Sequence, residues 1–411
     1  MLPESPPPPT VHKGFVGFGF GAIQAGLFLY EAHRSQNFSS LAVADVDKEL
    51  IHALRANMGF YTVNIAHATH IESVVVGPIQ IFDTTNPDEH PALVEAITQA
   101  SEIATAVPSV KLYTAGGASS IASLLAQGLT PDTLVYTAEN DTRAAEKLQA
   151  AVGAKAQFVN TVIGKMSRIV TDPEEMEVKK LTPICPGLDR AFLVESFNQI
   201  YISDTCNLPR GLQIFEEQPD LDPFEELKLY GHNAIHATAA YIGQALGCPD
   251  MATMPTIHNL MPFLRNILQY ELGTALLKRY PHTGHPFTTD GIHAYVDDLL
   301  QRIVNPYLDD TMERVGRDPE RKLGWNDRLI GALRMCQAEK VPAHGLGIGI
   351  ALAVQNFAHD HTDSTTLLNE LWAQDAPDTR EQEQILAAIA QAAKQIEEGT
   401  LDDLIARITT K

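Results

Sequence analysis

The sequence predicts an α/β domain followed by a mostly α-helical domain. Its 411 residues exceed what one compact core normally holds, so two domains are expected. Short apolar runs alternate with helical patterns up to residue 207, which is typical of a doubly wound sheet. From about Leu208 long amphipathic patterns dominate. We therefore expect a disordered proline-rich lead over residues 1–13, a first domain over 14–207 and a helical domain over 208–411.

Composition narrows the classes of partner. Hydrophobic content is 45% and charged content 20%, as in ordinary soluble proteins, but the formal net charge is −21. Nucleic acids and anionic membranes both require a basic surface, so neither is expected as a partner. A phosphorylated substrate would need a local basic pocket.

Cysteine usage and hydropathy suggest a cytoplasmic protein. Cys185, Cys206, Cys248 and Cys336 have no paired spacing suited to zinc or redox work, and we expect buried thiols in a reducing compartment. No run approaches the roughly 18 apolar residues of a membrane span. The first residues lack the apolar core of a signal peptide.

A glycine turn opens the first domain. An apolar strand over residues 14–18 leads into Gly19-Phe-Gly21, and a helix follows. In a Rossmann-type dinucleotide site Gly19 would make the turn, Gly21 would let the backbone approach a pyrophosphate, and Gly26 would allow close helix packing. The usual third glycine position holds Gln24. A glycine-rich turn in another α/β fold is the alternative.

Carboxylates follow two of the expected strands. The strand at residues 41–44 ends in Asp45, which would accept hydrogen bonds from both ribose hydroxyls and repel a 2′-phosphate, favouring NAD over NADP. Glu139 and Asn140 follow the strand at 133–138, where ligands bind in such sheets. The alternative for this pair is a polar cap on the next helix.

The remaining elements follow from periodicity. Further strands are expected at residues 73–76, 79–82, 110–115 and 162–170, the last interrupted at Gly164-Lys165. Helices are expected at residues 91–104, 237–246, 261–280, 293–304 and 381–396.

One stretch of the second domain carries groups suited to proton transfer, reading Glu225-Glu-Leu-Lys228-Leu-Tyr-Gly-His-Asn233-Ala-Ile-His236. In a helix turning about 100° per residue, Glu225, Lys228, Asn233 and His236 fall within roughly 140° of arc. Such a face suits carbonyl–alcohol interconversion, with one group exchanging the proton and neutral donors holding the oxygen. The lysine pKa must then fall toward neutrality, as burial beside Asn and His would cause. The alternative is a solvated helix surface.

A short basic segment lies farther along the second domain. It contains five of the chain's 30 basic residues, namely Arg314, Arg317, Arg321, Lys322 and Arg328. In so acidic a protein this is the local positive pocket that an anionic substrate requires. The alternative is a solvated face with pairs such as Glu313 with Arg317 and Asp318 with Lys322.

Together these stretches resemble the polyol-specific long-chain dehydrogenase family over most of the chain beyond the lead. The resemblance is strongest in Lys228-Leu-Tyr-Gly-His-Asn233-Ala-Ile-His236, in Asn305-Pro-Tyr-Leu with Glu313-Arg-Val-Gly-Arg, and in Arg321-Lys-Leu. The last two motifs and the overall length point to the branch that uses phosphorylated sugars. With the lysine stretch early in the second domain, the active site is expected in a cleft between the domains.

The resemblance implies NAD-dependent, metal-independent hydride transfer that interconverts D-mannitol 1-phosphate and D-fructose 6-phosphate. Lys228 matches the family's general acid/base, Asn233 a residue that polarises the reacting oxygen, and His236 a substrate-binding histidine. Asn160 matches a second oxygen-holding asparagine, and Glu225 a glutamate that conducts the lysine's proton.

Arg314 and Lys322 match basic substrate contacts, whereas Arg317 and Arg321 are candidates for the phosphate on charge alone. Two stretches depart from the family pattern: residues 161–167, which intervene before Arg168, and Gln24 in the glycine turn. Two other functions stay open. One is an enzyme of the same fold acting on an unphosphorylated polyol or a hexuronate, and the other is a non-catalytic NAD-binding sensor.

Overall fold

The computed structural model describes residues 13–153, 156–308, 310–358, 363–375 and 377–409. The chain divides into two compact units, the first ending at Leu221 and the second beginning at Asp222. The sequence predicts this change near Leu208. Strand β12 (Phe215–Glu217) pairs with β11 (Ile200–Ile202), and this pairing keeps the intervening chain in the first unit. Of the predicted lead, only Lys13 lies within the described residues.

The main sheet of the first unit has the predicted α/β architecture. In spatial order it contains β12, β11, β8 (Gln157–Ile163), β7 (Leu134–Thr137), β6 (Ala100–Thr105), β1 (Gly14–Phe18), β2 (Leu41–Asp45) and β5 (Gln80–Asp83). In this sheet each neighbouring pair from β8 to β5 is parallel, whereas β11 pairs antiparallel with β8 and β12 pairs parallel with β11. Parallel order brings the carboxyl ends of β1, β2, β6 and β7 to one edge, where a doubly wound fold binds its ligand.

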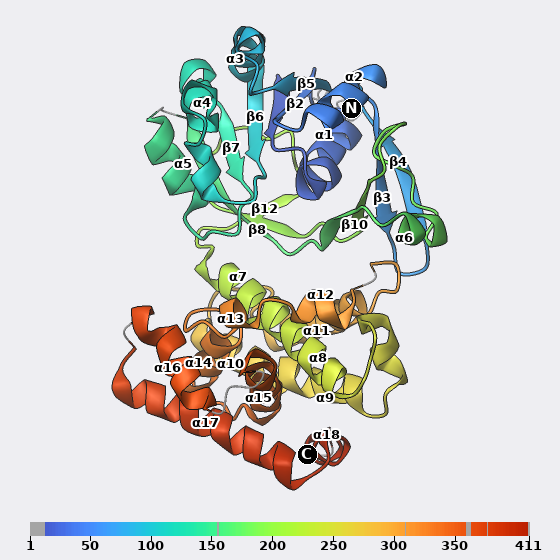
Figure 1. The fold of residues 1–411 in the computed structure, drawn as a ribbon. Coiled ribbons are helices and arrows are strands. Elements are labelled where there is room, and N and C mark those ends of the chain that lie inside the picture. The colour runs from blue at the N-terminus through green and yellow to red at the C-terminus, as the bar shows by residue number, and fades with distance from the viewer. Residues whose placement is uncertain (1–12, 154–155, 309, 359–362, 376, 410–411) are drawn as a thin grey trace, which may run out of the picture. The chain divides into compact units, whose positions relative to one another are not determined.

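Helices cover both faces of this sheet. Helices α3 (His90–Gln99), α4 (Ile121–Gly128) and α5 (Ala144–Val152) pack on one face, with Val16 and Phe18 of β1 in the core beneath them. The other face is covered by the π-helical segment η1 (Gln24–Leu29) and by α1 (Tyr30–Ser35), as Figure 1 shows. Helix α2 (Lys48–Ala56) follows β2 and begins at an Asp47 cap.

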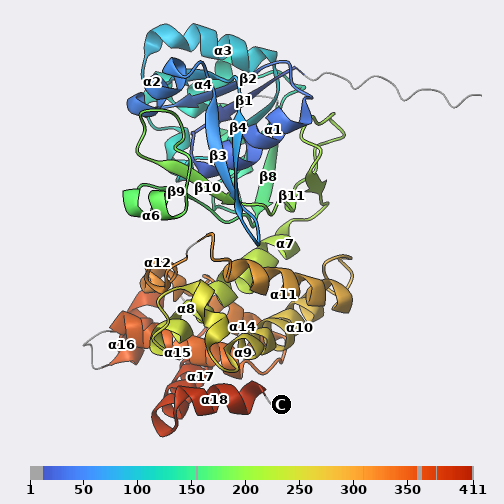
Figure 2. The ribbon, with the colours of Figure 1, turned by 90° about the vertical axis from the view of Figure 1, so that its right-hand side faces the viewer.

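A smaller sheet packs against η1 in the first unit. Its order is β4 (Ile71–Val76), β3 (Tyr61–Ala66), β10 (Ala191–Glu195) and β9 (Ser167–Val170). Figure 2 shows β3 and β4 beside β10 and β9, with α6 (Pro173–Val178) after β9. Strand β4 was predicted from the sequence, whereas β10 was not, because its short buried run has no alternating pattern. Strand β3 was not predicted either.

Two predicted elements differ from the structure. The helix expected through residue 104 ends at Gln99, and residues 100–105 form β6. This strand is buried on both faces, and such a run cannot be separated from a buried helix by periodicity. The strand expected at residues 110–115 is a 3-10 turn, Val110–Tyr113, whose first turn is capped when Ser109 accepts a hydrogen bond from the Lys111 amide.

The second unit is helical in its described part. One continuous helix runs through α7 (Asp222–Glu226), the π-helical η5 (Leu227–Asn233) and α8 (Ala234–Ala245). Helix α15 (His344–Ala358) packs between α8 and α17 (Thr379–Glu398). Around these lie η6 (Met251–Thr256), α9 (Leu260–Asn266), η7 (Ile267–Leu272), α10 (Gly273–Arg279), α11 (Thr289–Ile303), α12 (Met312–Gly316), α13 (Pro319–Lys322), α14 (Ile330–Ala338), α16 (Ser364–Trp372) and α18 (Leu401–Thr409).

The helices predicted in this unit all occur, within a few residues of their expected ends. Within the described ranges, none is both long and apolar enough to span a bilayer. Three of the four cysteines are buried free thiols, as expected, but Cys206 is exposed. It stands at a φ of +53° in the turn after β11, which carries its side chain outward.

Candidate active site

The glycine turn after β1 leaves room for a dinucleotide. Gly19 has a φ of +81°, and a Cβ there would lie 2.7 Å from the Ala106 carbonyl oxygen, so only glycine fits. A Cβ at Gly21 would meet no atom within 4 Å, which means open space in front of the backbone. The first position is therefore closed by the protein and the second is open to a ligand, as a pyrophosphate cradle requires.

The departure at Gln24 is compensated within the same turn. Gln24 is fully buried, and a Cβ on Gly17 would lie 2.3 Å from its amide nitrogen. Where the usual motif has a small residue on the helix, this chain has Gln24, and the small residue is Gly17 on strand β1. The Gln24 side chain fills the space beside Gly17. Neither polar atom of its amide has a hydrogen-bond partner among the described residues. Gly26 faces Val194 of β10, where a Cβ would approach to 2.5 Å, so it serves close packing as expected.

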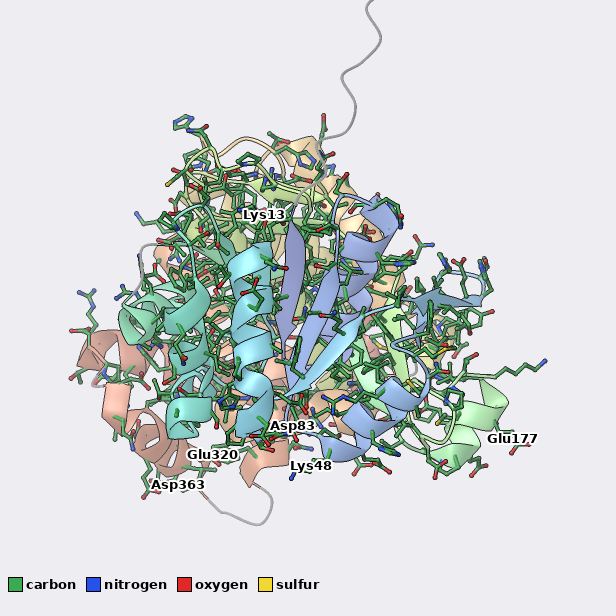
Figure 3. The ribbon with its side chains drawn as sticks, turned by 90° about the horizontal axis from the view of Figure 1, so that it is seen from above. Lys13, Lys48, Asp83, Glu177, Glu320 and Asp363 are labelled. Atoms are coloured by element: carbon green, nitrogen blue, oxygen red, sulfur yellow. The ribbon has the colours of Figure 1, made fainter. Side chains whose placement is uncertain are left out.

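Asp45 ends β2 with its carboxylate held in place by three backbone amides. The amides belong to Phe20, Val46 and Asp47, at 2.5, 2.7 and 2.8 Å. Beside it in the sheet, Asp83, which Figure 3 labels, ends β5. The carboxylate stays half-exposed beside the glycine turn. Turn and carboxylate together fit the pyrophosphate and ribose of NAD.

Glu139 does not cap the next helix, which begins at Ala144, and its role as a ligand contact stays a prediction. Its buried carboxylate accepts hydrogen bonds from the Thr105 hydroxyl and the Val107 amide, both at 3.0 Å, and from the Tyr113 hydroxyl. Burial raises its pKa. Glu139 therefore holds the loop after β6, whose Ala106 carbonyl faces Gly19. Asn140 is exposed beside it.

Asn160 lies on β8, paired with Thr137 of β7. Its side-chain oxygen accepts a hydrogen bond from the Ala145 amide, and its nitrogen donates to Glu146, both at 2.9 Å. Asn160 thus satisfies an amide of the first turn of α5. Its nitrogen keeps a second hydrogen for another acceptor.

The unusual stretch after Asn160 forms the corner between β8 and β9. Lys165 is buried at this corner, and its ammonium donates to the Phe197 carbonyl at 2.9 Å, to Asn198 Oδ1 at 2.7 Å and to the Glu195 carbonyl. The inserted residues therefore tie this corner to the end of β10.

Lys228 stands in a π-helical segment, and this changes the geometry assumed from the sequence. In an α-helix residues five apart point about 140° away from each other. In a π-helix hydrogen bonds run from i to i+5, so residues five apart lie one above the other. Lys228 and Asn233 are five apart within η5, and the π-helix therefore puts them on one face. His236 follows in α8, less than one α-turn beyond Asn233.

The surroundings of Lys228 favour its neutral form. Burial lowers its pKa to about 8, the nearby Arg328 guanidinium adds to the effect, and Glu225 opposes it. His232, one turn along, is buried as well, and its pKa is held well below the ordinary value by burial and by Arg302. An amine near neutrality beside an uncharged imidazole is what proton exchange requires.

The structure adds a residue that sequence reasoning missed. Asp310 is buried, its Oδ2 lies 3.2 Å from His236 Nε2, and its other oxygen forms an ion pair with Arg314. One carboxylate thus joins two residues that were predicted separately to contact the substrate. The i,i+4 spacing of Asp310 and Arg314 was the available signal.

Lys322 is the buried member of the basic segment. Its ammonium donates to the Arg317 carbonyl, and burial with Arg328 and Arg321 lowers its pKa to about 8 against the pull of Asp318. Burial is the main cause of the lowered pKa, and the neighbouring arginines add to it, so both act against the charged form of Lys322.

The other basic residues form ion pairs that differ from those considered from the sequence. Arg321 contacts Asp318 at 2.6 Å and Asp327 at 3.6 Å, and Arg328 contacts Asp327 at 2.8 Å. Arg317 is exposed and forms no ion pair with another described residue. It is therefore the arginine most available to an anion.

Comparison with known proteins shows which family this chain belongs to. The family model of the mannitol dehydrogenase C-terminal domain matches residues 220–411. The mannitol-1-phosphate 5-dehydrogenase of Exiguobacterium sibiricum is 30% identical over 348 residues, which cover 82% of this chain and 84% of that protein. The enzyme of the same name from Enterococcus faecalis is 28% identical, with 89% and 91% covered.

Two solved structures share the fold. D-sorbitol dehydrogenase in substrate-free form superposes with a TM-score of 0.74 at 14% identity, covering 96% of this chain and 95% of that one. The Pseudomonas fluorescens mannitol 2-dehydrogenase, solved with NAD and D-mannitol, gives 0.67 at 14% identity, with 97% and 94% covered. The chain therefore belongs to the mannitol dehydrogenase family and is an NAD-dependent polyol dehydrogenase. The predicted fold class, family and cofactor are confirmed.

Proposed function

We propose that this enzyme interconverts D-mannitol 1-phosphate and D-fructose 6-phosphate, with Lys228 as the general acid/base. The observation that carries the proposal is that Lys228 and Lys322 share Arg328 as a neighbour: burial is the main cause that lowers both pKa values, and the Arg328 guanidinium adds to it in each case. The basic segment therefore lies beside the lysine suited to proton transfer. The names of the relatives reported above support the same substrate.

Bound NAD supplies the hydride acceptor, or the donor as NADH. Lys228 takes the hydroxyl proton of the polyol in its neutral form and returns it as an ammonium in the reverse direction. Asn233, on the same face of η5, donates to the reacting oxygen as charge develops on it. Glu225, which favours the charged form of Lys228, passes the proton to or from water.

The second oxygen-holding group in this proposal is Asn160, through the amide hydrogen that Glu146 does not use. His236 binds a hydroxyl of the substrate, and Arg314 binds a further substrate oxygen. Asp310 contacts both side chains and holds them in position. Arg317 and Lys322 take the phosphate, because a dianion offsets the excess positive charge around Lys322. Arg321 is the weaker candidate, since two carboxylates already contact it.

The test compares D-fructose 6-phosphate with D-fructose, tagaturonate and fructuronate at equal concentrations, following NADH oxidation. We expect catalytic efficiency at least about a hundredfold higher for the phosphate ester, or about 3 kcal/mol. Comparable rates with fructose, or a preference for a hexuronate, would assign a sister activity of the same fold. No turnover with any of the four would favour the NAD-binding sensor.

The role of the basic segment is tested by Arg317→Ala. Loss of a charge-assisted contact should raise KM for D-fructose 6-phosphate about tenfold or more with little change in kcat. Arg265→Ala is the matched control, because Arg265 is a partly exposed arginine of the second unit whose guanidinium pairs with Asp297. An unchanged KM in Arg317→Ala would favour an unphosphorylated substrate.

A further inference from the structure

A tyrosine contacts the π-helical segment at its first residue. Tyr295 of α11 donates a hydrogen bond from its hydroxyl to the Leu227 carbonyl at 3.2 Å. Where an α-helix passes into a π-helix, the hydrogen-bond register shifts by one residue, and a carbonyl at the transition loses its usual partner. At this transition the Tyr295 hydroxyl donates to the Leu227 carbonyl, so the start of η5 has a contact from another helix.

Gly231, in the middle of η5, leaves the space through which this hydroxyl approaches. A Cβ on Gly231 would lie 2.9 Å from the Tyr295 hydroxyl oxygen, a separation that real Cβ atoms essentially never show. Gly231 lies within η5 and has no positive φ, so its backbone conformation does not require glycine. The contact with the Tyr295 hydroxyl is the reason that a side chain does not fit there.

We propose that Tyr295 and Gly231 are positioning residues that hold the π-helical turn on which Lys228 and Asn233 share one face. This inference rests on the proposed role of Lys228 in proton transfer. The spacing from Lys228 to Asn233 is five residues, and five residues bring two side chains together only in the π register. Without the hydroxyl the segment regains its α register, which turns Asn233 about 140° away from Lys228.

The first experiment is Tyr295→Phe, which keeps the ring and removes the contact with Leu227. Misplacing a reacting group by about 1 Å costs on the order of a hundredfold in rate, so kcat should fall at least tenfold while the NADH dissociation constant stays within twofold. Tyr136→Phe is the control. It removes another buried tyrosine hydroxyl, one that donates to Glu102 in the first unit, and kcat should hardly change.

Gly231→Ala supplies a second, independent variant. Its added methyl displaces the Tyr295 hydroxyl, so kcat should fall to a similar degree. In the double variant Gly231→Ala with Tyr295→Phe the two losses should not multiply, because both act through one contact. Fully multiplicative losses would overturn the shared role.

A readout that needs no sugar separates this inference from the proposed function. Competitive amine labelling across pH, followed by mass spectrometry, reports the pKa of Lys228 directly. In Tyr295→Phe this pKa should rise toward the value of a free lysine as the side chain gains solvent. If the shift occurs but the wild type reduces no sugar phosphate, the proposed substrate fails and the inference stands. A lower melting temperature with unchanged kcat and unchanged labelling would reduce Tyr295 to a structural role and overturn the inference.

Discussion

Lys165 in the first unit and Lys228 in the second are both shielded from water, but the groups around their ammonium nitrogens differ. Lys165 is buried at the β8–β9 corner with its ammonium donating to three oxygen acceptors. Lys228 is half-buried on η5 beside the Arg328 guanidinium, and its pKa falls to about 8. The first lysine fixes two segments to each other, and the second has the lowered pKa that its proposed role in proton exchange needs.

The difference lies in the groups around each ammonium. An ammonium needs acceptors to offset the desolvation of burial, and Lys165 has one for each of its hydrogens. A nearby cation and burial together act against the charged form, which is the situation of Lys228. Burial of a lysine therefore does not identify a catalytic group until the neighbouring charges are known.

The largest expected effect separates the two lysines directly. Lys228→Ala should lower kcat by about 10²–10⁴, the range of general acid/base catalysis, and leave the NADH dissociation constant unchanged. Lys165→Met should do the opposite, lowering the melting temperature because three acceptors lose their donor at a cost of at least about 2 kcal/mol, with kcat within a few-fold. Steady-state kinetics and thermal melts on both variants decide. If the Lys165→Met variant folded and bound NADH normally but showed no turnover, Lys165 would have a role in the reaction and the contrast with Lys228 would be wrong.

The same comparison applies to buried carboxylates. Glu139 accepts from three donors and holds a loop, whereas Asp310 lies between His236 and Arg314. We expect Asp310→Asn to lower kcat/KM for the polyol by about ten- to a hundredfold, because the two proposed substrate contacts both lose their charged partner. NADH affinity should stay the same.

Asp297→Asn is the matched control for Asp310→Asn. Asp297 pairs with Arg265 on the surface, where an ion pair contributes little. Equal losses in the two variants would mean that Asp310 contributes only general electrostatics.

Sequence alone could predict features that depend on near neighbours. The Gly19-Phe-Gly21 turn, the carboxylate at the end of β2 and the helix that carries Lys228 all follow from local spacing. The position of Glu139 could not be predicted, because its partners Thr105 and Tyr113 lie far away in the chain. The interpretation as ligand contact or helix cap considered only nearby groups.

The π-helical turn could not be predicted from the sequence for a different reason. Apolar periodicity over seven residues does not distinguish a π register from an α register, and the contact that supports it comes from Tyr295 on α11. The ordinary helix assumed from the sequence put Lys228 and Asn233 at opposite limits of one broad face. The observed register brings them together.

A smaller effect concerns the charges that set the pKa of Lys228. Polyol oxidation needs the neutral amine, so its kcat should rise as pH passes about 8; ketone reduction needs the ammonium, so its kcat should fall over the same range. Arg328→Met removes a cation that lowers this pKa and should move both midpoints upward. Glu225→Gln removes the opposing carboxylate and should move them downward. If the pH midpoints shifted in the same direction in Arg328→Met and in Glu225→Gln, this account would be contradicted.

The smallest effect tests Gln24, a buried polar group that differs from both lysines because no described residue pairs with it. Gly17→Ala should lower the free energy of unfolding by about 1–3 kcal/mol, since its methyl meets the Gln24 amide. The double variant Gly17→Ala with Gln24→Gly should recover much of this lost stability, because position 24 then has the small residue of the usual motif and leaves space for the methyl group at position 17.

Gln24→Met keeps the volume of the side chain and removes the amide, and it sharpens the contrast with Lys165. If the amide has no partner, the variant should be as stable as the wild type or more so, because the desolvation of an unpaired polar group is relieved. NADH affinity, measured by fluorescence titration, should then stay constant. A loss of stability or of NADH affinity would mean that water or the cofactor pairs with Gln24, and would place it with Lys165 among the buried groups whose partners hold them.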